Sequence, residues 1–165
     1  MSHRSSAAVV SRRPGRRAGR REDRRLALLR RAGFLGPLPE GVTITRATEV
    51  ADLRAAYSLV HDVYVERGYM DPAPGGLRLR CYEAFPETAT FVAKADGRVV
   101  GVTTAILDSR DAGLPSDFAF GQENDSLRSR GIRLCEISNW VVAPDYRKTP
   151  AFFELFRCAF AYAKS

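Results

Sequence analysis

The chain has 165 residues, of which 45% are hydrophobic and 10% aromatic, so it is long enough to form one domain with a buried core. Its net charge of +7 is unevenly distributed: residues 1–33 hold 11 arginines against Glu22 and Asp23, whereas the remainder holds 15 Lys or Arg against 17 Asp or Glu. The basic character therefore belongs to an N-terminal arm, which argues against a nucleic-acid-binding fold with its own basic patch.

Residues 1–38 are predicted to be an Arg-rich tail that is disordered or partly helical, and the folded domain is predicted to span residues 39–165. Within the tail, residues 24–36 could form a short basic amphipathic helix that rests on a membrane surface. A weak contact of residues 1–33 with anionic surfaces therefore remains open, while specific nucleic-acid recognition is not predicted.

The first half of the domain is predicted to contain one strand and one long helix. The stretch VTITRA at 42–47 alternates β-forming residues and favours a strand. Between residues 48 and 69, Leu53, Tyr57, Val60 and Tyr64 recur at the spacing of one helical face. The Pro- and Gly-rich residues 71–76 then predict a loop.

The second half is predicted to contain a β-hairpin, a short helix, a strand and a final helix. Asp96-Gly97 between two β-type runs is a strong hairpin signal. A short helix or pair of turns follows up to Gly131, then a strand over 132–144 and a helix from Pro150 onward. This order predicts an α/β fold in which helices flank a mixed sheet.

Cysteine and histidine content excludes several kinds of site. The three cysteines lack CxxC spacing and favour neither a disulfide framework nor a zinc site, and Cys135 and Cys158 are predicted to be packed core residues. His3 and His61 are too few for a His-based triad or a poly-His metal site. No apolar run reaches the ~18 residues of a membrane span. The expected location is cytoplasmic, with peripheral membrane contact as the alternative.

Four motifs occur in a defined order: VYVERGY at 63–69, FVAKADGRVVGV at 91–102, LDS followed by GLP at 107–115, and CEISNWVV at 135–142. In this order they resemble the N-acyl amino acid synthases, relatives of acyl-homoserine-lactone synthases in the GCN5-related N-acetyltransferase superfamily. The resemblance implies an acetyltransferase-like fold whose final strands would lie beyond Ser165. It also implies transfer of a fatty acyl group from an acyl carrier protein or coenzyme A to the amine of an amino acid-like acceptor, with no bound cofactor and no metal.

Glu136 is the candidate general base. In the resembling synthases a Glu opens an E-x-S motif, here Glu136-Ile137-Ser138, and a carboxylate can take the proton that an attacking amine must lose. The structural alternative is an ion pair of Glu136 with Arg133 or Arg46. Ser138 shares its face and could orient the acceptor or bond to the backbone.

Three further residues are candidates for acceptor binding. Asp108 ends a predicted strand and could hold the acceptor's ammonium group, or simply serve the turn that follows. Tyr64 and Tyr69 could line the acceptor or acyl pocket, although core packing is the stronger interpretation of Tyr64.

The donor is predicted to bind along Trp140, Val141 and Val142, whose backbone could pair with a pantetheine arm and hold the oxyanion. Arg147 and Lys148 lie in the loop where the superfamily holds the donor's phosphate, or form an ordinary solvated basic turn. This loop lacks the family's glycines, which favours a carrier protein over coenzyme A.

Two positions depart from the homoserine-lactone synthases, which have arginine where this chain has Asn139 and Val60. These departures favour an amino acid acceptor over S-adenosylmethionine. Two alternatives to an enzyme remain: a truncated, non-catalytic acyltransferase-like protein, and a nucleic-acid or membrane binder that acts through its Arg-rich tail.

Overall fold

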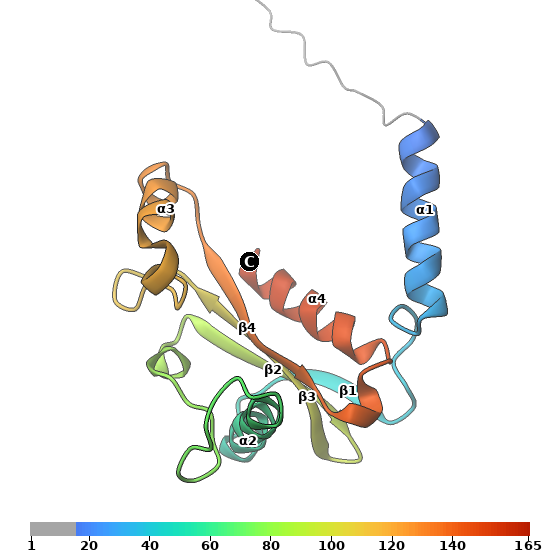
Figure 1. Cartoon of the computed structure of the whole chain (residues 1–165), viewed down its shortest axis with the longest axis horizontal. Coiled ribbons are helices and arrows are strands. Elements are labelled where there is room, and N and C mark those ends of the chain that lie inside the picture. The colour runs from blue at the N-terminus through green and yellow to red at the C-terminus, as the bar shows by residue number, and fades with distance from the viewer. Residues whose placement is uncertain (1–15) are drawn as a thin grey trace, which may run out of the picture.

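The computed structural model describes the backbone of residues 16–165 and the side chains of residues 24–165. Its centre is a four-stranded antiparallel sheet in the order β1-β2-β3-β4 (Figure 1). The strands are β1 (Val42–Arg46), β2 (Thr88–Ala95), β3 (Arg98–Leu107) and β4 (Cys135–Val142). The helices are α1 (Arg16–Arg31), α2 (Val50–Glu66), α3 (Asp117–Ser129) and α4 (Ala151–Ala163), with short 3-10 turns at Cys81–Ala84 and Pro144–Tyr146.

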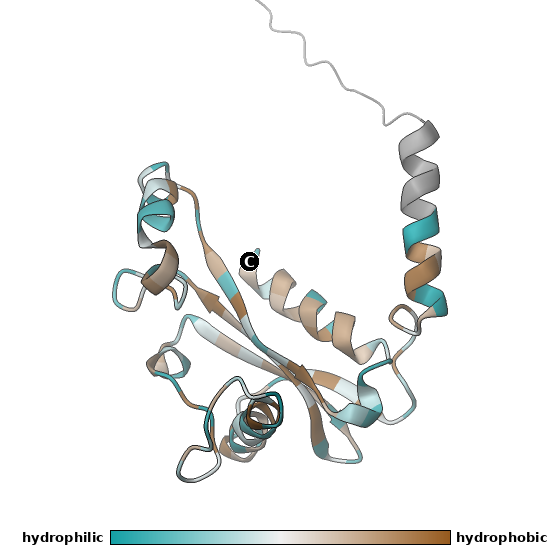
Figure 2. Cartoon of the chain, viewed as in Figure 1, coloured by the Kyte–Doolittle hydropathy of each residue, from teal (hydrophilic) through white to brown (hydrophobic). Residues whose placement is uncertain are grey.

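The core has two layers because α2 covers one face of the sheet and α4 covers the other (Figure 1). Both faces of β3 are therefore buried, and this strand is an almost continuous run of buried residues from Val100 to Ile106. Hydrophobic residues are concentrated in the middle of the sheet (Figure 2). The α4-side cluster contains Val42, Ala93, Ala95, Val100, Val142, Ala151 and Leu155, and the α2-side cluster contains Ala47, Ala56, Tyr57, Val60, Val92, Val102 and Val141.

The predicted hairpin and helical periodicity are confirmed. Asp96 and Gly97 join β2 to β3 with φ angles of 48° and 76°, the left-handed values that a two-residue hairpin turn requires. Tyr57 and Val60 are buried under the sheet, with Leu53 and Tyr64 packed beside them. The hydrophobic face of α2 is therefore the one that its spacing predicted.

A bulge in β4 changes the direction of its side chains. Val141 pairs with Val102, but Ser138 pairs with Thr104, so Asn139 and Trp140 share the single partner position between them. Asn139 has a φ of 51°, a left-handed value that asparagine tolerates better than most residues. Because of the bulge, the side chains of Ser138 and Asn139 both lie on the α2 side of the sheet, whereas Trp140 packs on α4.

The prediction that Cys135 is packed in the core is wrong: Cys135 is exposed at the start of β4, Cys81 is also exposed, and Cys158 is half-buried. The tail is helical over Arg16–Arg31, and residues 1–15 lie outside the described part of the chain. In that part, no helix combines the length and apolar character needed to cross a bilayer.

Candidate active site

Glu136 is a half-buried carboxylate on the edge strand β4. Its Oε2 accepts a hydrogen bond from the backbone N–H of Ser116 at 2.8 Å, at the start of α3. Among the described side chains, neither Arg46 nor Arg133 forms an ion pair with it, so the ion pair that was the alternative to a catalytic role is not observed. Ser138 lies two residues further along β4, half-buried and opposite Thr104.

A cavity of about 390 Å³ lies beside β4 and brings together six of the ten predicted site residues. Tyr64 and Tyr69 contact each other edge-on with their ring centroids 5.7 Å apart, and Tyr69 is 72% exposed, which places it at the rim. The six are Tyr64, Tyr69, Trp140, Val141, Val142 and Arg147, and the remaining lining residues are Phe34, Val63, Arg67 and Phe152.

One edge of β4 pairs with β3, and no other described strand pairs with its second edge. The N–H of Ala143 donates to the carbonyl of Val100 at 2.8 Å, so it points toward β3. Because backbone groups alternate in direction along the regular part of a strand, the N–H and C=O groups of Val142 point away from β3. These groups can pair with an extended ligand laid along the edge.

Aromatic packing fixes the wall of this cavity. The Trp140 ring stacks on Phe152 with centroids 4.1 Å apart, and its Nε1 donates to the Phe152 carbonyl at 3.0 Å. Phe34, in the loop after α1, packs on Phe152 and on Phe153, at centroid distances of 6.3 and 5.5 Å. At Gly33 a Cβ would lie 2.5 Å from the Lys148 carbonyl oxygen, so this close approach requires glycine.

Arg147 lines the cavity together with a second arginine, Arg67, whereas Lys148 is exposed and does not line it. The Arg147 Nε donates to the Val142 carbonyl at 3.4 Å, and its Nη2 lies 3.5 Å from Glu66. This Nη2 is buried and has no hydrogen-bond partner among the described residues. Arg147 therefore has a donor available for an anionic ligand.

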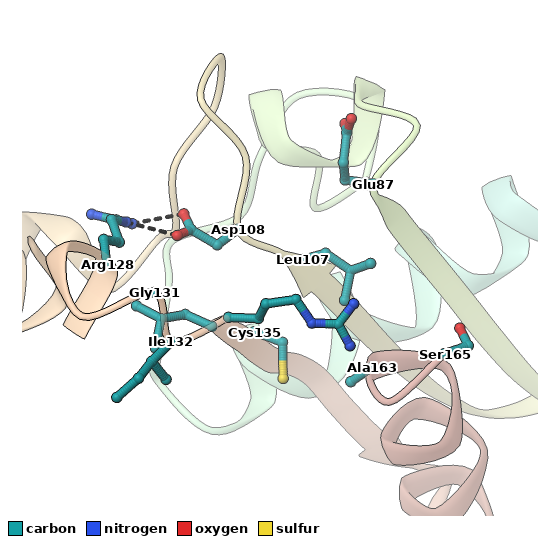
Figure 3. Close-up of a pocket in the computed structure, with 11 residues that line it drawn as sticks. Glu87, Leu107, Asp108, Arg128, Gly131, Ile132, Cys135, Ala163 and Ser165 are labelled. Carbon is teal, nitrogen blue, oxygen red and sulfur yellow. Dashed lines mark hydrogen bonds and ion pairs between the residues drawn. The ribbon is translucent and has the colours of Figure 1, made fainter.

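Asp108 lies on a second cavity, of about 400 Å³, at the far end of β3 and β4 (Figure 3). Both of its oxygens accept hydrogen bonds from Arg128, at 2.7 Å each. Arg128 also binds Asp117 and Asp125, and its hydrogen bonds hold the pKa of the Asp117 carboxyl down at about 2. Because Arg128 occupies Asp108, the role of Asp108 in binding an ammonium group stays a prediction.

The sequence did not identify a buried polar network around Asn139, three residues after Glu136 on β4. Asn139 is 1% exposed; its Nδ2 donates to Glu83 at 3.1 Å and to Thr104 at 3.2 Å, while its Oδ1 accepts from Arg78 at 2.7 Å. The Arg78 guanidinium also lies 4.8 Å from the ring centroid of Tyr64. The alternation of leucine and arginine over residues 77–80 was the one sequence signal for this network.

A sequence profile described as N-acyl amino acid synthase FeeM matches residues 55–165. The solved structure of FeeM, an N-acyl amino acid synthase from uncultured soil microbes, is similar over 74% of this chain and 65% of that chain, with 21% identity and a TM-score of 0.62. A Trypanosoma brucei acetyltransferase matches over 74% and 75% (18% identity, TM-score 0.47). An aminoglycoside acetyltransferase from an uncultured soil metagenomic sample matches over 75% and 70% (13% identity, TM-score 0.48). No curated protein matches the sequence.

Proposed function

Because the chain belongs to the FeeM family of N-acyl amino acid synthases, we propose that it transfers a fatty acyl group from a thioester to the amine of an amino acid-like acceptor. The observation that carries this proposal is the state of Glu136, a half-buried carboxylate that accepts a hydrogen bond from one backbone amide and pairs with no described arginine. The chain spans 65% of the solved FeeM chain, and the likeness in structure supports the shared fold.

In the proposed reaction, Glu136 accepts a proton from the acceptor's ammonium group, directly or through water, and releases a nucleophilic amine. The amine nitrogen bonds to the thioester carbonyl carbon, and the outward N–H group of Val142 on β4 stabilises the oxyanion. The C–S bond then breaks, and the pantetheine thiol leaves with a proton. The products are an amide and a free thiol, and no acyl-enzyme forms.

We propose an acyl carrier protein as the donor, with acyl-CoA as the weaker substrate. Coenzyme A would require free amides at the N-terminus of α4 for its diphosphate. Here Pro150 has no N–H. The N–H of Ala151 donates to the Thr149 hydroxyl at 3.4 Å, and the N–H of Phe152 donates to the Thr149 carbonyl at 3.4 Å, so neither amide is free. Carrier-bound phosphopantetheine needs a site for a single phosphate, which Arg147 could provide, because its Nη2 is 3.5 Å from Glu66 and forms no hydrogen bond with the described residues.

The test is N-acylation of free amino acids by the full chain, with acyl carrier protein and CoA thioesters of the same acyl length. Glu136→Gln keeps an oxygen that can accept from Ser116 but loses the basic carboxylate, so kcat is expected to fall roughly 10²- to 10⁴-fold. Glu123→Gln, on the exposed part of α3, is the matched control and is expected to match the wild type.

Full activity in Glu136→Gln would remove Glu136 from the mechanism. If the folded wild-type protein makes no N-acylated product with either donor, the enzyme proposal fails and the non-catalytic alternative stands. A higher kcat/KM with acyl-CoA than with the carrier protein would overturn the choice of donor.

Helix α1 supports a second candidate function, contact with an anionic surface. It contains eight arginines against Glu22 and Asp23, and it stands away from the sheet (Figure 1). Binding to anionic vesicles or DNA that weakens with salt and disappears on deletion of residues 1–31 would support this function. Binding that persists after the deletion would place the contact elsewhere.

A further inference from the structure

Arg78 is half-buried without a carboxylate partner among the described side chains, whereas Arg46, Arg98 and Arg133, which also lack one, are exposed. Arg78 lies in the segment between α2 and β2, and its Nη1 donates to Asn139 at 2.7 Å. Among the described side chains it forms no ion pair, whereas Arg80 pairs with Glu83 and Arg128 pairs with Asp108. A half-buried guanidinium that is hydrogen-bonded only to a neutral amide retains capacity to bind an anion.

Three contacts hold Arg78 in place, one through its backbone and two through its guanidinium. Its backbone N–H donates to the Tyr57 carbonyl of α2 at 3.1 Å, and the guanidinium lies over the Tyr64 ring, 4.8 Å from the centroid. Asn139, its third contact, is itself held by Glu83 and Thr104. With one nitrogen engaged and the group held in place, the remaining N–H donors of the planar fork are preorganised for a carboxylate.

The electrostatic surroundings of Arg78 also favour an incoming anion. Burial lowers the pKa of the Arg78 guanidinium, and the neighbouring charge of Arg80 lowers it further. Glu83 and Tyr64 act in the opposite direction without cancelling these effects. The guanidinium stays charged at neutral pH, so its positive charge is only partly compensated within the protein.

Arg78 lies between the cavity and the candidate base. Tyr64, under its guanidinium, lines the cavity, and Asn139 precedes Trp140, which also lines it. Glu136 is on the α2 side of β4, as Asn139 is, because Glu136 and Ser138 pair with alternate residues of β3 and Thr104 bonds to Asn139. Glu136 and Asn139 are three residues apart, which is ~10 Å along a strand. One small ligand can span this separation and contact both positions.

We infer that Arg78 binds the carboxylate of the acceptor and thereby directs the acceptor's amine toward Glu136. The inference rests on the proposed acyltransferase function and makes it more specific. It assigns recognition of the acceptor's carboxylate, the group that distinguishes an amino acid from a simple amine, to one side chain. It also assigns a role to the segment between α2 and β2, which the motifs did not include.

The test compares two acceptors in two proteins. The acceptors are the amino acid that the wild-type protein acylates fastest and the amine formed by its decarboxylation, and the proteins are the wild type and Arg78→Met. The wild type is expected to have a KM for the amino acid roughly 10- to 100-fold below that for the amine, the size of a charge-assisted contact. In Arg78→Met the KM for the amino acid is expected to rise by that factor, and that for the amine to stay within about twofold.

Arg46→Met is the matched control, because Arg46 also stacks on a tyrosine, with its guanidinium 5.2 Å from the Tyr162 centroid, but lies on the opposite edge strand β1. It is expected to leave both KM values unchanged. If melting curves show that Arg78→Met is unfolded, Arg78→Lys replaces it: the charge remains, the fork is lost, and a smaller rise in KM for the amino acid alone is expected.

Equal changes in KM for both acceptors, or a wild type that does not discriminate between them, would overturn this inference and leave the acyltransferase proposal intact. Absence of turnover with every amine would instead overturn the proposed function.

Discussion

Two half-buried arginines, Arg128 and Arg78, differ in how many of their N–H donors are engaged by other side chains of the protein. Arg128, whose side chain is 28% exposed, binds three carboxylates, those of Asp108, Asp117 and Asp125. Among the described residues, the Arg78 guanidinium forms one hydrogen bond, to the neutral amide of Asn139. A guanidinium whose donors are engaged by carboxylates within the protein holds elements together, whereas one with free donors next to a residue that lines a cavity, as Arg78 is next to Tyr64, is available for a ligand.

The two groups also connect different parts of the fold. Arg128 is near the end of α3 and binds Asp108 at the end of β3, so it fixes α3 to the sheet. The start of α3 supplies the Ser116 amide that binds Glu136. The Arg128 cluster therefore supports the base indirectly, and the Arg78 network lies beside the substrate cavity itself.

The largest expected effect on stability comes from removing the amide that anchors Arg78. In Asn139→Ala, Glu83 and Thr104 lose a buried partner and alanine must adopt a φ of 51°. We expect the free energy of unfolding to fall by about 2–4 kcal/mol, because buried unpaired polar groups and a strained backbone both contribute. Denaturant unfolding measures this change.

Asn139→Gly separates the two contributions. Glycine adopts the left-handed φ without strain but forms none of the hydrogen bonds, so it should recover about 1 kcal/mol of the loss in Asn139→Ala. Wild-type stability in both variants would show that the network contributes nothing to folding.

A smaller, pH-dependent effect is expected for Arg128→Met. Arg128 lowers the pKa of Asp117 from 3.8 to about 2, so this carboxylate stabilises the fold above pH 4 and the contribution is lost as the pH falls toward 2. The melting temperature of the variant should be lower than that of the wild type at pH 7, and the difference should shrink between pH 4 and pH 2.

Arg130→Met is the control for this experiment, because Arg130 is exposed at the end of the same helix. It should melt like the wild type at both pH values. In assays for the amino acid and its decarboxylated amine, Arg128→Met should also leave the ratio of their KM values unchanged. A changed ratio would show that the Arg128 cluster takes part in acceptor recognition and would remove the distinction between the two arginines.

Local sequence signals were sufficient for much of the fold. Asp96-Gly97 determines a hairpin turn by its backbone preference alone, and the spacing of apolar residues on α2 reflects the sheet face that it covers. Six of the predicted site residues also line one cavity, because strand β4 and the end of α2 form its walls.

The remaining features depend on contacts between distant residues. Strict alternation would place Ser138 and Trp140 on one face, but the bulge at Asn139 turns Trp140 toward α4. Arg78 and Asn139 are 61 residues apart in sequence, and Arg128 and Asp108 are 20 apart, so neither pair is visible in a local pattern. Cys135 has apolar neighbours in sequence but is exposed at the start of its strand.

The smallest effect is expected for a third arginine, Arg157 on α4. It pairs with Glu154 one turn earlier and lowers the pKa of that carboxyl, but its side chain is 72% exposed and water screens the interaction. Arg157→Ala should therefore leave the melting temperature and both KM values unchanged at pH 7. Arg157→Ala could instead lose as much stability as Arg128→Met. That result would show that neither shielding from water nor the number of carboxylate partners determines how much an arginine contributes to stability here. The contrast between Arg128 and Arg78 would then lose its physical basis.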